Sequence, residues 1–225
     1  MLPGILEGLA VLLIALHLWC VNISSSAPLV GILIGALARR HKSDVLAERA
    51  KRLGIQGMMM LLAGIVLGFA LAGVMWLAGD RGLFEVLPRF AYKIKWGIAE
   101  LVFYVACMLG YVALSSSTDM RPGARWGRGV LAVLAATNLL YHFPPLFIVM
   151  AQAADHPSLF SEAVDASEFR KWLVQGRVVS LTFHFGLASL AVAALVTTDR
   201  LLNSSKHETD EVGVQAAVRG TAAVA

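Results

Sequence analysis

The chain has 225 residues, of which 58% are hydrophobic and only 15% are charged, with a formal net charge of +4. Soluble domains carry about 25% charged residues, so this composition excludes an ordinary water-soluble enzyme and indicates a polytopic membrane protein. Several apolar runs exceed the roughly 18 residues that mark a membrane-spanning helix. The lipid bilayer is therefore the first expected partner.

Five apolar segments predict an all-α fold, a polytopic bundle of five transmembrane helices. A chain in lipid must satisfy its backbone hydrogen bonds within each span, and helices do so. The expected spans are about 5–37, 54–78, 92–115, 128–152 and 172–198, and together they form one transmembrane helical bundle over residues 1–198. Residues 199–225 are polar and alanine-rich, and we expect them to form a disordered cytoplasmic tail.

The first segment, 5–37, is too long for a single perpendicular span, because helices rise about 1.5 Å per residue and the hydrocarbon core is roughly 30 Å thick. Its middle reads "NISSSAPLVG", residues 22–31. Pro28 removes a backbone donor, and the serines before it can bond to helix carbonyls and bend the helix. We expect one long, kinked first helix. It lacks the basic region of a secretory signal, so we expect it to be retained.

Lysine and arginine in the connections predict the orientation. The first connection, "RRHKSDVLAERAKR", is strongly basic, and the third carries Arg121, Arg125 and Arg128. Both belong on the cytoplasmic side by the positive-inside rule. The second connection has a balanced charge and the fourth is acidic, so both suit the outer face. The sequence thus predicts a bacterial-type inner (plasma) membrane protein with its N-terminus outside and its C-terminus in the cytoplasm.

Small residues and cysteines give weaker signals. Gly31 and Gly35 form one GxxxG pattern, and Gly64 and Gly68 form another, which allows close helix approach within the bundle or in a homo-oligomer. The two cysteines lie in different spans without CxxC spacing, so we expect neither a disulfide nor covalently attached haem. The run Met58, Met59 and Met60 points around a helix and is interpreted as packing.

Three histidines fall inside predicted spans: His17, His142 and His184. Counted from the predicted outer edge, all three lie about 10 to 12 residues deep. Ionisable residues within spans usually face the bundle interior and are functional candidates. The alternative interpretation is that each ring forms a hydrogen bond with a neighbouring helix.

Imidazoles at one level of a helical bundle suit a metal, since neutral histidine is the commonest protein ligand for metals. Haem b needs two axial ligands on facing helices, whereas a bare copper ion would use three or more donors. In "YHFPP" the prolines Pro144 and Pro145 are expected to break the helix after His142. We expect His142 and His184 as the axial ligands of a haem b. His17 remains a third ligand, a quinol-side proton acceptor or the true partner of His184.

Haem propionates need cations near the aqueous edge. Arg177 precedes His184 by seven residues, which places it on nearly the same side of the helix. Lys95 lies at the same outer boundary, as do Lys93, Arg89 and Lys171, and the alternative for each is interfacial snorkelling. No Ser-His-Asp set, phosphate loop, HExxH motif or nucleic-acid-binding stripe is present.

Two segments carry a family resemblance: "ALHLWCVNISSSAPLVGILI" and "YKIKWGIAELVFYVACMLGYVAL". Both resemble helices of small, cytochrome-b-like membrane proteins of the copper resistance D and HemJ types. The resemblance implies a haem site that involves His17 and Lys95. For relatives of HemJ it also implies oxidation of protoporphyrinogen.

The leading functional hypothesis is electron transfer by a membrane haem b protein, with a quinol and a redox partner protein as its expected partners. Bis-histidine ligation in a dry bundle suits electron transfer. Three alternatives remain open: a copper-handling membrane protein, a HemJ-like protoporphyrinogen oxidase, and a cofactor-free structural membrane protein.

Overall fold

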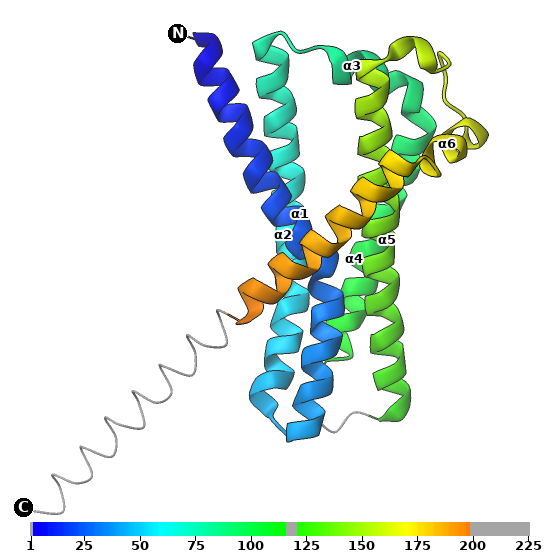
Figure 1. Ribbon diagram of the computed structural model, residues 1–225. Helices are drawn as coiled ribbons and strands as arrows, with labels where there is room; N and C mark the ends of the chain where they lie inside the picture. The colour runs from blue at the N-terminus through cyan, green and yellow to red at the C-terminus, as the bar shows by residue number, and fades with distance from the viewer. Residues whose placement is uncertain (1, 116–120, 199–225) are drawn as a thin grey trace, which may run out of the picture.

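Five long apolar helices dominate the computed structural model of the protein, which describes residues 2–115 and 121–198 (Figure 1). Every regular element in these ranges is helical. The predicted disordered tail, 199–225, lies outside the described residues. The elements in chain order are α1 (Leu2–His41), α2 (Asp44–Ala78), α3 (Gly82–Val86), the 3-10 helix η1 (Leu87–Phe90), α4 (Ala91–Ala113), α5 (Pro122–Asp155), the 3-10 helix η2 (Pro157–Leu159), α6 (Ala166–Leu173) and a final helix, Gly176–Thr198.

The prediction of five membrane-spanning helices is confirmed in number and order, since five helices have the length and hydropathy to cross a bilayer. Four of them extend beyond the apolar runs. α2 begins ten residues before its predicted span, at Asp44, where Ser43 caps the helix by accepting the Leu46 amide at 3.3 Å. α1 has 40 residues. At 1.5 Å per residue this helix measures about 60 Å and projects past the hydrocarbon core.

Prolines lie inside two of these helices. α1 is continuous through Pro28, as predicted, and its axis changes direction between its two halves (Figure 1). α5 is also continuous through Pro144 and Pro145, so the prediction that they break the helix after His142 is wrong. Both prolines are buried, and the side chains of Leu146, Val149 and Met150 just beyond them pack in the core. This packing holds the helical path where local propensity opposes it.

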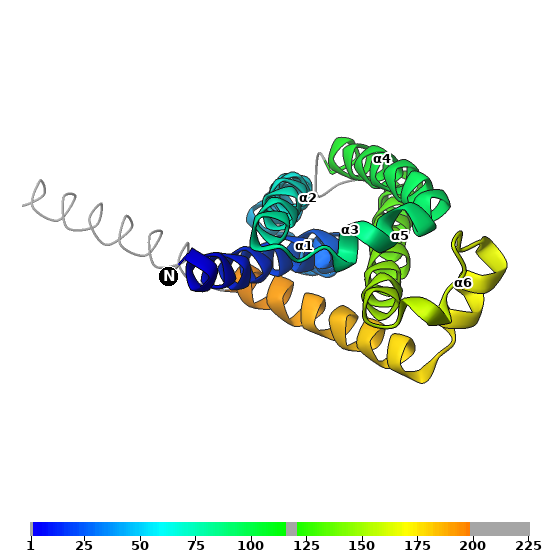
Figure 2. The same ribbon diagram turned by 90° about the horizontal axis from the view of Figure 1, so that it is seen from above.

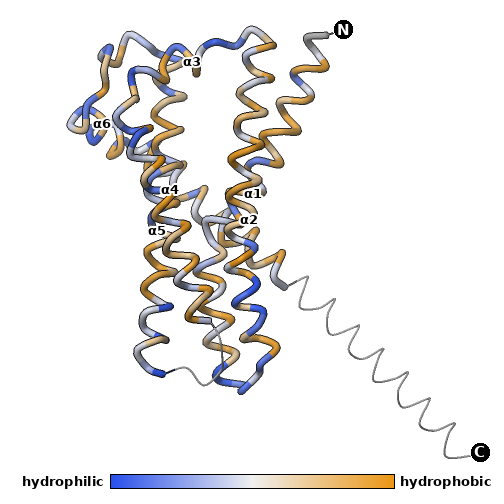
Figure 3. The backbone as a smooth tube through the Cα atoms, turned by 180° about the vertical axis from the view of Figure 1, so that it is seen from behind, coloured by the Kyte–Doolittle hydropathy of each residue, from blue (hydrophilic) through white to orange (hydrophobic). Residues whose placement is uncertain are grey.

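The basic connections lie at one end of the bundle. α1 and α2 form a hairpin through Lys42 and Ser43, and α4 ends near the beginning of α5 at that same end (Figure 1). Figure 3 shows hydrophilic segments at this end and a largely hydrophobic tube along the spans. We call residues 20–41, 44–64, 102–113 and 122–139 the basic half. The remainder of α1, α2, α4 and α5, with α3, η1 and α6, is the open half.

Arg128 lies at the centre of the basic half although the sequence placed it in a connection. The side chain is only 5% exposed, because α5 begins at Pro122 and carries it inside. Its Nη2 lies 3.4 Å from the Gly31 carbonyl oxygen, and its guanidinium lies 5.1 Å from the ring centroid of Tyr111, within cation–π range. A side chain at Gly35 would overlap this guanidinium. The glycine therefore provides the space that the buried arginine occupies.

Tyr104 compensates for Pro28. A proline at position 28 cannot donate to the carbonyl of Ser24, four residues earlier, so that carbonyl lacks its helical partner. The buried Tyr104 hydroxyl on α4 donates to this same oxygen at 2.8 Å. Gly57 on α2 leaves room, since a Cβ there would lie 3.1 Å from the hydroxyl. One tyrosine thus replaces the missing backbone donor and joins α4 to α1.

The open half divides into two arms. No residue from 4 to 19 of α1 is buried, and between 65 and 78 of α2 only Val74 is. These segments form the first arm. The second arm, residues 82–101 and 140–173, has its own core around Phe90, Met150 and Phe169. Figures 1 and 3 show the two arms diverging away from the basic half.

The final helix runs obliquely along one side of the bundle, past α5 and α1 (Figure 2). Its buried residues are Val178, Ser189 and Ala193. The Ser189 hydroxyl donates to Asn22 Oδ1 at 2.7 Å, and Ala193 packs with apolar side chains of α1 and α2. The remaining large side chains of this helix are mostly exposed, as suits a surface that faces lipid.

Candidate functional site

His17 lies in the first arm and faces α2. Its Nδ1 is 2.8 Å from the carbonyl oxygen of Gly64. A carbonyl only accepts, so Nδ1 carries the proton and, in the neutral ring, Nε2 carries the free lone pair. Gly68 provides space for the ring, because a Cβ there would lie 3.2 Å from His17 Cε1. This is the arrangement in which protein histidines bind metals, with one nitrogen held by a carbonyl and the other available.

His142 lies in the second arm and faces α4. Its Nε2 is buried and has no hydrogen-bond partner. A Cβ at Gly97 would lie 3.6 Å from this nitrogen, and the ring stands edge-on to Phe143 with centroids 5.2 Å apart. Glu100 and Lys93 are the charged groups that act on it electrostatically. A buried, unpartnered ring nitrogen costs about 1–3 kcal/mol, so a ligand on His142 would remove this cost. Within the described residues, buried atoms of Ser26, Arg81, Gln152 and Thr182 also lack a hydrogen-bond partner, but none of these side chains is a histidine.

The other predicted haem contacts are on the surface. His184 and Arg177 are exposed on the final helix, and Lys95 is exposed on α4. Arg177 lies in the first turn of its helix, at the level where a charged side chain reaches the membrane interface. The structure therefore brings neither His142 and His184 nor Lys95 and His17 together in one buried site.

Lys93 is the more enclosed of the two predicted α4 lysines. It is half-buried, and its Nζ lies 4.4 Å from the ring centroid of Phe169 on α6. The second arm thus places a cation beside His142 in the first turn of α4. Asn138 adds a further link, since its Nδ2 donates to the Glu100 carbonyl at 2.6 Å and fixes α5 against α4 one turn from His142.

Metal ligation by protein groups alone has little support in the described ranges. Within residues 2–115 and 121–198, no three His, Cys, Asp or Glu side chains lie close enough together to hold a metal ion. Cys20 and Cys107 are buried free thiols in different helices. A metal held by His17 or His142 would need ligands that this part of the chain does not gather, and a porphyrin supplies four of them.

Sequence reasoning missed the polar residues that organise the basic half. Tyr104, Tyr111 and Arg128 each reach α1 or α2, and the Tyr111 hydroxyl donates to the Ala50 carbonyl at 3.1 Å. The signal that could have found them is the set of glycines spaced along α1 and α2. Gly31 was interpreted as a point of close helix approach, and a Cβ there would lie 3.6 Å from the Ala50 carbonyl oxygen of α2. The same Cβ would also overlap the Tyr111 hydroxyl, which the sequence did not predict.

Comparisons with protein-family models, with curated proteins and with solved structures found no match.

Proposed function

We propose that the chain is a membrane haem b protein that transfers electrons, and that His17 and His142 would hold the haem iron. The observation that carries the proposal is the buried, unpartnered Nε2 of His142. His17 supports it, because its Nδ1 bond to Gly64 leaves Nε2 available. The two ligands come from different arms, so the haem would join them. His142 is retained from the sequence prediction, and His17 replaces the exposed His184 as its partner.

Glycines make room for both imidazole rings. Gly68 lies beside His17 and Gly97 beside His142, and a larger residue at either position would meet the imidazole. Lys93, next to His142, is the described cation best placed to pair with a propionate. When bound between two histidines, haem supplies a one-electron redox couple that is closed to oxygen, which favours electron transfer over oxidase chemistry. A quinol and a redox partner protein remain the proposed partners.

The proposed location is a bacterial-type plasma membrane. Arg39 and Arg40 in the last turn of α1, and Lys42 just after it, share one end of the bundle with Arg121 and the beginning of α5. The positive-inside rule assigns this end to the cytoplasm. The N-terminus then lies outside, and the chain beyond the final helix enters the cytoplasm.

The reduced-minus-oxidised visible spectrum of the detergent-purified protein, made with ample haem supply, tests the proposal. We expect a sharp low-spin b-type band in the wild type. His142→Ala and His17→Ala should each lose it, and added imidazole should restore it in both. His184→Ala and His156→Ala are matched controls that should keep full haem. A wild type without haem absorbance, or full haem in His142→Ala, would overturn the assignment.

A cofactor-free structural protein is the second candidate. The observation that favours it is the His17 hydrogen bond to Gly64, which joins α1 and α2 without any ligand. In that case His17→Ala would lower the stability of the hairpin, and imidazole would restore no spectrum. Copper handling is ranked below both, because no three-ligand group is present in the described residues.

A further inference from the structure

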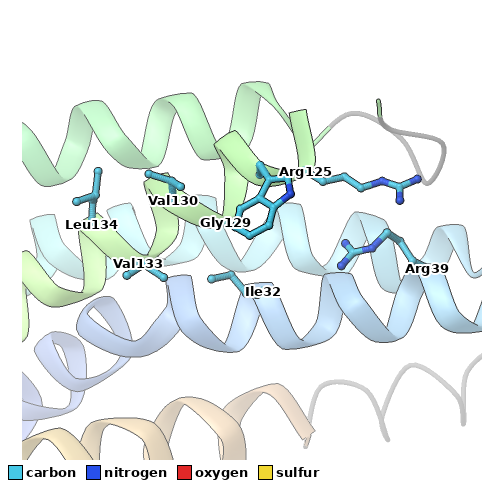
Figure 4. Close-up of a pocket in the computed structure, with 8 residues that line it drawn as sticks. Ile32, Arg39, Arg125, Gly129, Val130, Val133 and Leu134 are labelled. Carbon is cyan, nitrogen blue, oxygen red and sulfur yellow. The ribbon is translucent and has the colours of Figure 1, made fainter. Parts of the chain in front are cut away.

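A groove of about 550 Å³ runs between α1 and α5 at the basic end of the bundle. It is separate from His17 and His142, which lie in the arms. Figure 4 shows Arg39 and Arg125 at one end of the groove and the apolar residues Ile32, Val130 and Val133 farther along it. The groove therefore has a cationic mouth and an apolar floor.

Two arginines, Arg39 and Arg125, line the mouth of the groove. Arg39 is half-buried, and both charged groups of the described chain that act on it electrostatically are cations, Arg125 and Arg128. Both cations repel the Arg39 guanidinium, and an anion beside Arg39 would relieve that repulsion. Arginine suits a phosphate in particular, because its planar guanidinium donates two parallel hydrogen bonds.

The apolar floor of the groove suits a hydrocarbon chain. Ile32, Val130, Val133 and Leu134 line it, and Gly129 deepens it because it has no side chain. Trp126, which also lines the groove, is 79% exposed, as is common for tryptophan at a membrane interface. A soluble anion would use only the mouth, whereas a phospholipid would use both parts.

We propose that this groove binds an anionic glycerophospholipid from the leaflet at the basic end. The phosphate lies between Arg39 and Arg125, and one acyl chain lies along Val130, Val133 and Leu134. Basic pockets between transmembrane helices on the cytoplasmic side are a recurrent way to hold anionic headgroups. The lipid joins α1 to α5 at the level where Arg128 already contacts Gly31.

Native mass spectrometry of the full chain in detergent tests the proposal, with phosphatidylglycerol and phosphatidylcholine of identical acyl chains as probes. We expect the wild type to retain phosphatidylglycerol preferentially. Arg39→Gln should weaken its binding about fivefold and Arg39→Gln with Arg125→Gln about 25-fold, since each cation near the headgroup contributes about a factor of five. Arg40→Gln is the matched control, because Arg40 is exposed, adjacent and outside the groove.

A second pair of variants tests the floor. A Cβ at Gly129 meets nothing within 4 Å, so Gly129→Phe fills the groove without displacing the backbone. It should reduce retention of phosphatidylglycerol. Gly123→Phe, at an equally open position of α5 outside the groove, should not. The haem spectrum is expected to be unchanged in all these variants, which keeps the two proposals separately testable.

Three results would overturn the proposal. The first is equal retention of the two lipids by the wild type. The second is unchanged phosphatidylglycerol binding in the folded double arginine variant. The third is displacement of the lipid by an equal concentration of glycerol phosphate, which would identify the ligand as a soluble phosphate compound.

Discussion

The basic half and the open half are built from the same four helices, yet they pack differently. In the basic half, the side chain of Arg128 occupies the space that a Cβ at Gly35 would need, and the side chain of Tyr111 does the same at Gly31. In the open half, Gly8 on the same helix α1 has nothing within 4 Å of where its Cβ would be, and its neighbours from 4 to 19 are all at least partly exposed. In lipid, apolar sequence alone gives helices no reason to associate, so small residues and polar contacts decide where they do.

The largest expected effect compares two glycines of α1, one in each half. Gly35→Ala places a methyl group where the Arg128 guanidinium lies, so the arginine must leave its buried site, and we expect a loss of about 3 kcal/mol of stability. Gly8→Ala, in the first arm, should change stability by less than about 1 kcal/mol. Thermal unfolding in detergent measures both. Equal stability of the two variants would show that Arg128 does not need the space at Gly35.

A second effect tests the compensation of Pro28 by Tyr104. Tyr104→Phe leaves the Ser24 carbonyl buried without a donor, at a cost of about 1–3 kcal/mol. Pro28→Ala restores the helical donor, so Tyr104→Phe should cost much less in that background. Tyr141→Phe, at an exposed tyrosine of the open half, is the matched control. Strictly additive effects in the double variant would contradict the compensation.

The next effect concerns the final helix, which crosses both halves. Ser189→Ala removes its hydrogen bond to Asn22, and interhelical bonds of this kind contribute about 0.6 kcal/mol on average. Hydrogen exchange across 176–198 should become faster. Ser180→Ala, exposed on the same helix, should leave the exchange unchanged. The same result for both serines would mean that the helix is held by apolar contacts alone.

The smallest effect is local to α6 in the second arm. Asp165 caps this helix: one carboxylate oxygen accepts the Glu168 and Ser167 amides at 2.8 and 2.7 Å and the Ser167 hydroxyl at 2.8 Å. These donors lower the pKa of the carboxyl below its ordinary 3.8. The cap therefore stabilises α6 fully above pH 3.8, and this stabilisation is lost as the pH falls through the lowered pKa of Asp165.

The protection factors of the 166–173 amides, which correct exchange for its intrinsic dependence on pH, check this. They should fall in acid and, at neutral pH, in Asp165→Ala. Glu162→Gln, exposed and outside the helix, is the control. Protection factors in α6 that are insensitive to both acid and Asp165→Ala would contradict the role of the cap.

The number of spans and the continuity of α1 through Pro28 could be predicted from the sequence, because length and hydropathy decide what crosses a bilayer. The helix ends could not, since polar stretches such as "DVLAERAKRL" at the beginning of α2 are good helix formers that extend into water. The continuity of α5 through Pro144 depends on packing from neighbouring helices, and no local rule contains that information.

The histidines also show what could not be predicted from the sequence. Their similar depth followed from counting along each span, but depth does not say which way a ring points. His17 contacts Gly64, 47 residues away, and His184 is exposed at a comparable depth. The rotation of each helix about its own axis separates the two cases. Tyrosine and arginine contacts with glycines help to set it for α1, and the Ser189 bond to Asn22 does so for the final helix. Both kinds of contact involve residues far apart in sequence.

The bond between Tyr104 and Ser24 also has a consequence for how this sequence can change over time. Pro28 and Tyr104 lie far apart along the chain but form one chemical unit, because the first removes a donor and the second supplies it. Losing the tyrosine while keeping the proline is costly, whereas losing the proline first makes the tyrosine dispensable. Substitutions at the two positions are therefore expected to be inherited in a fixed order, with the proline replaced first.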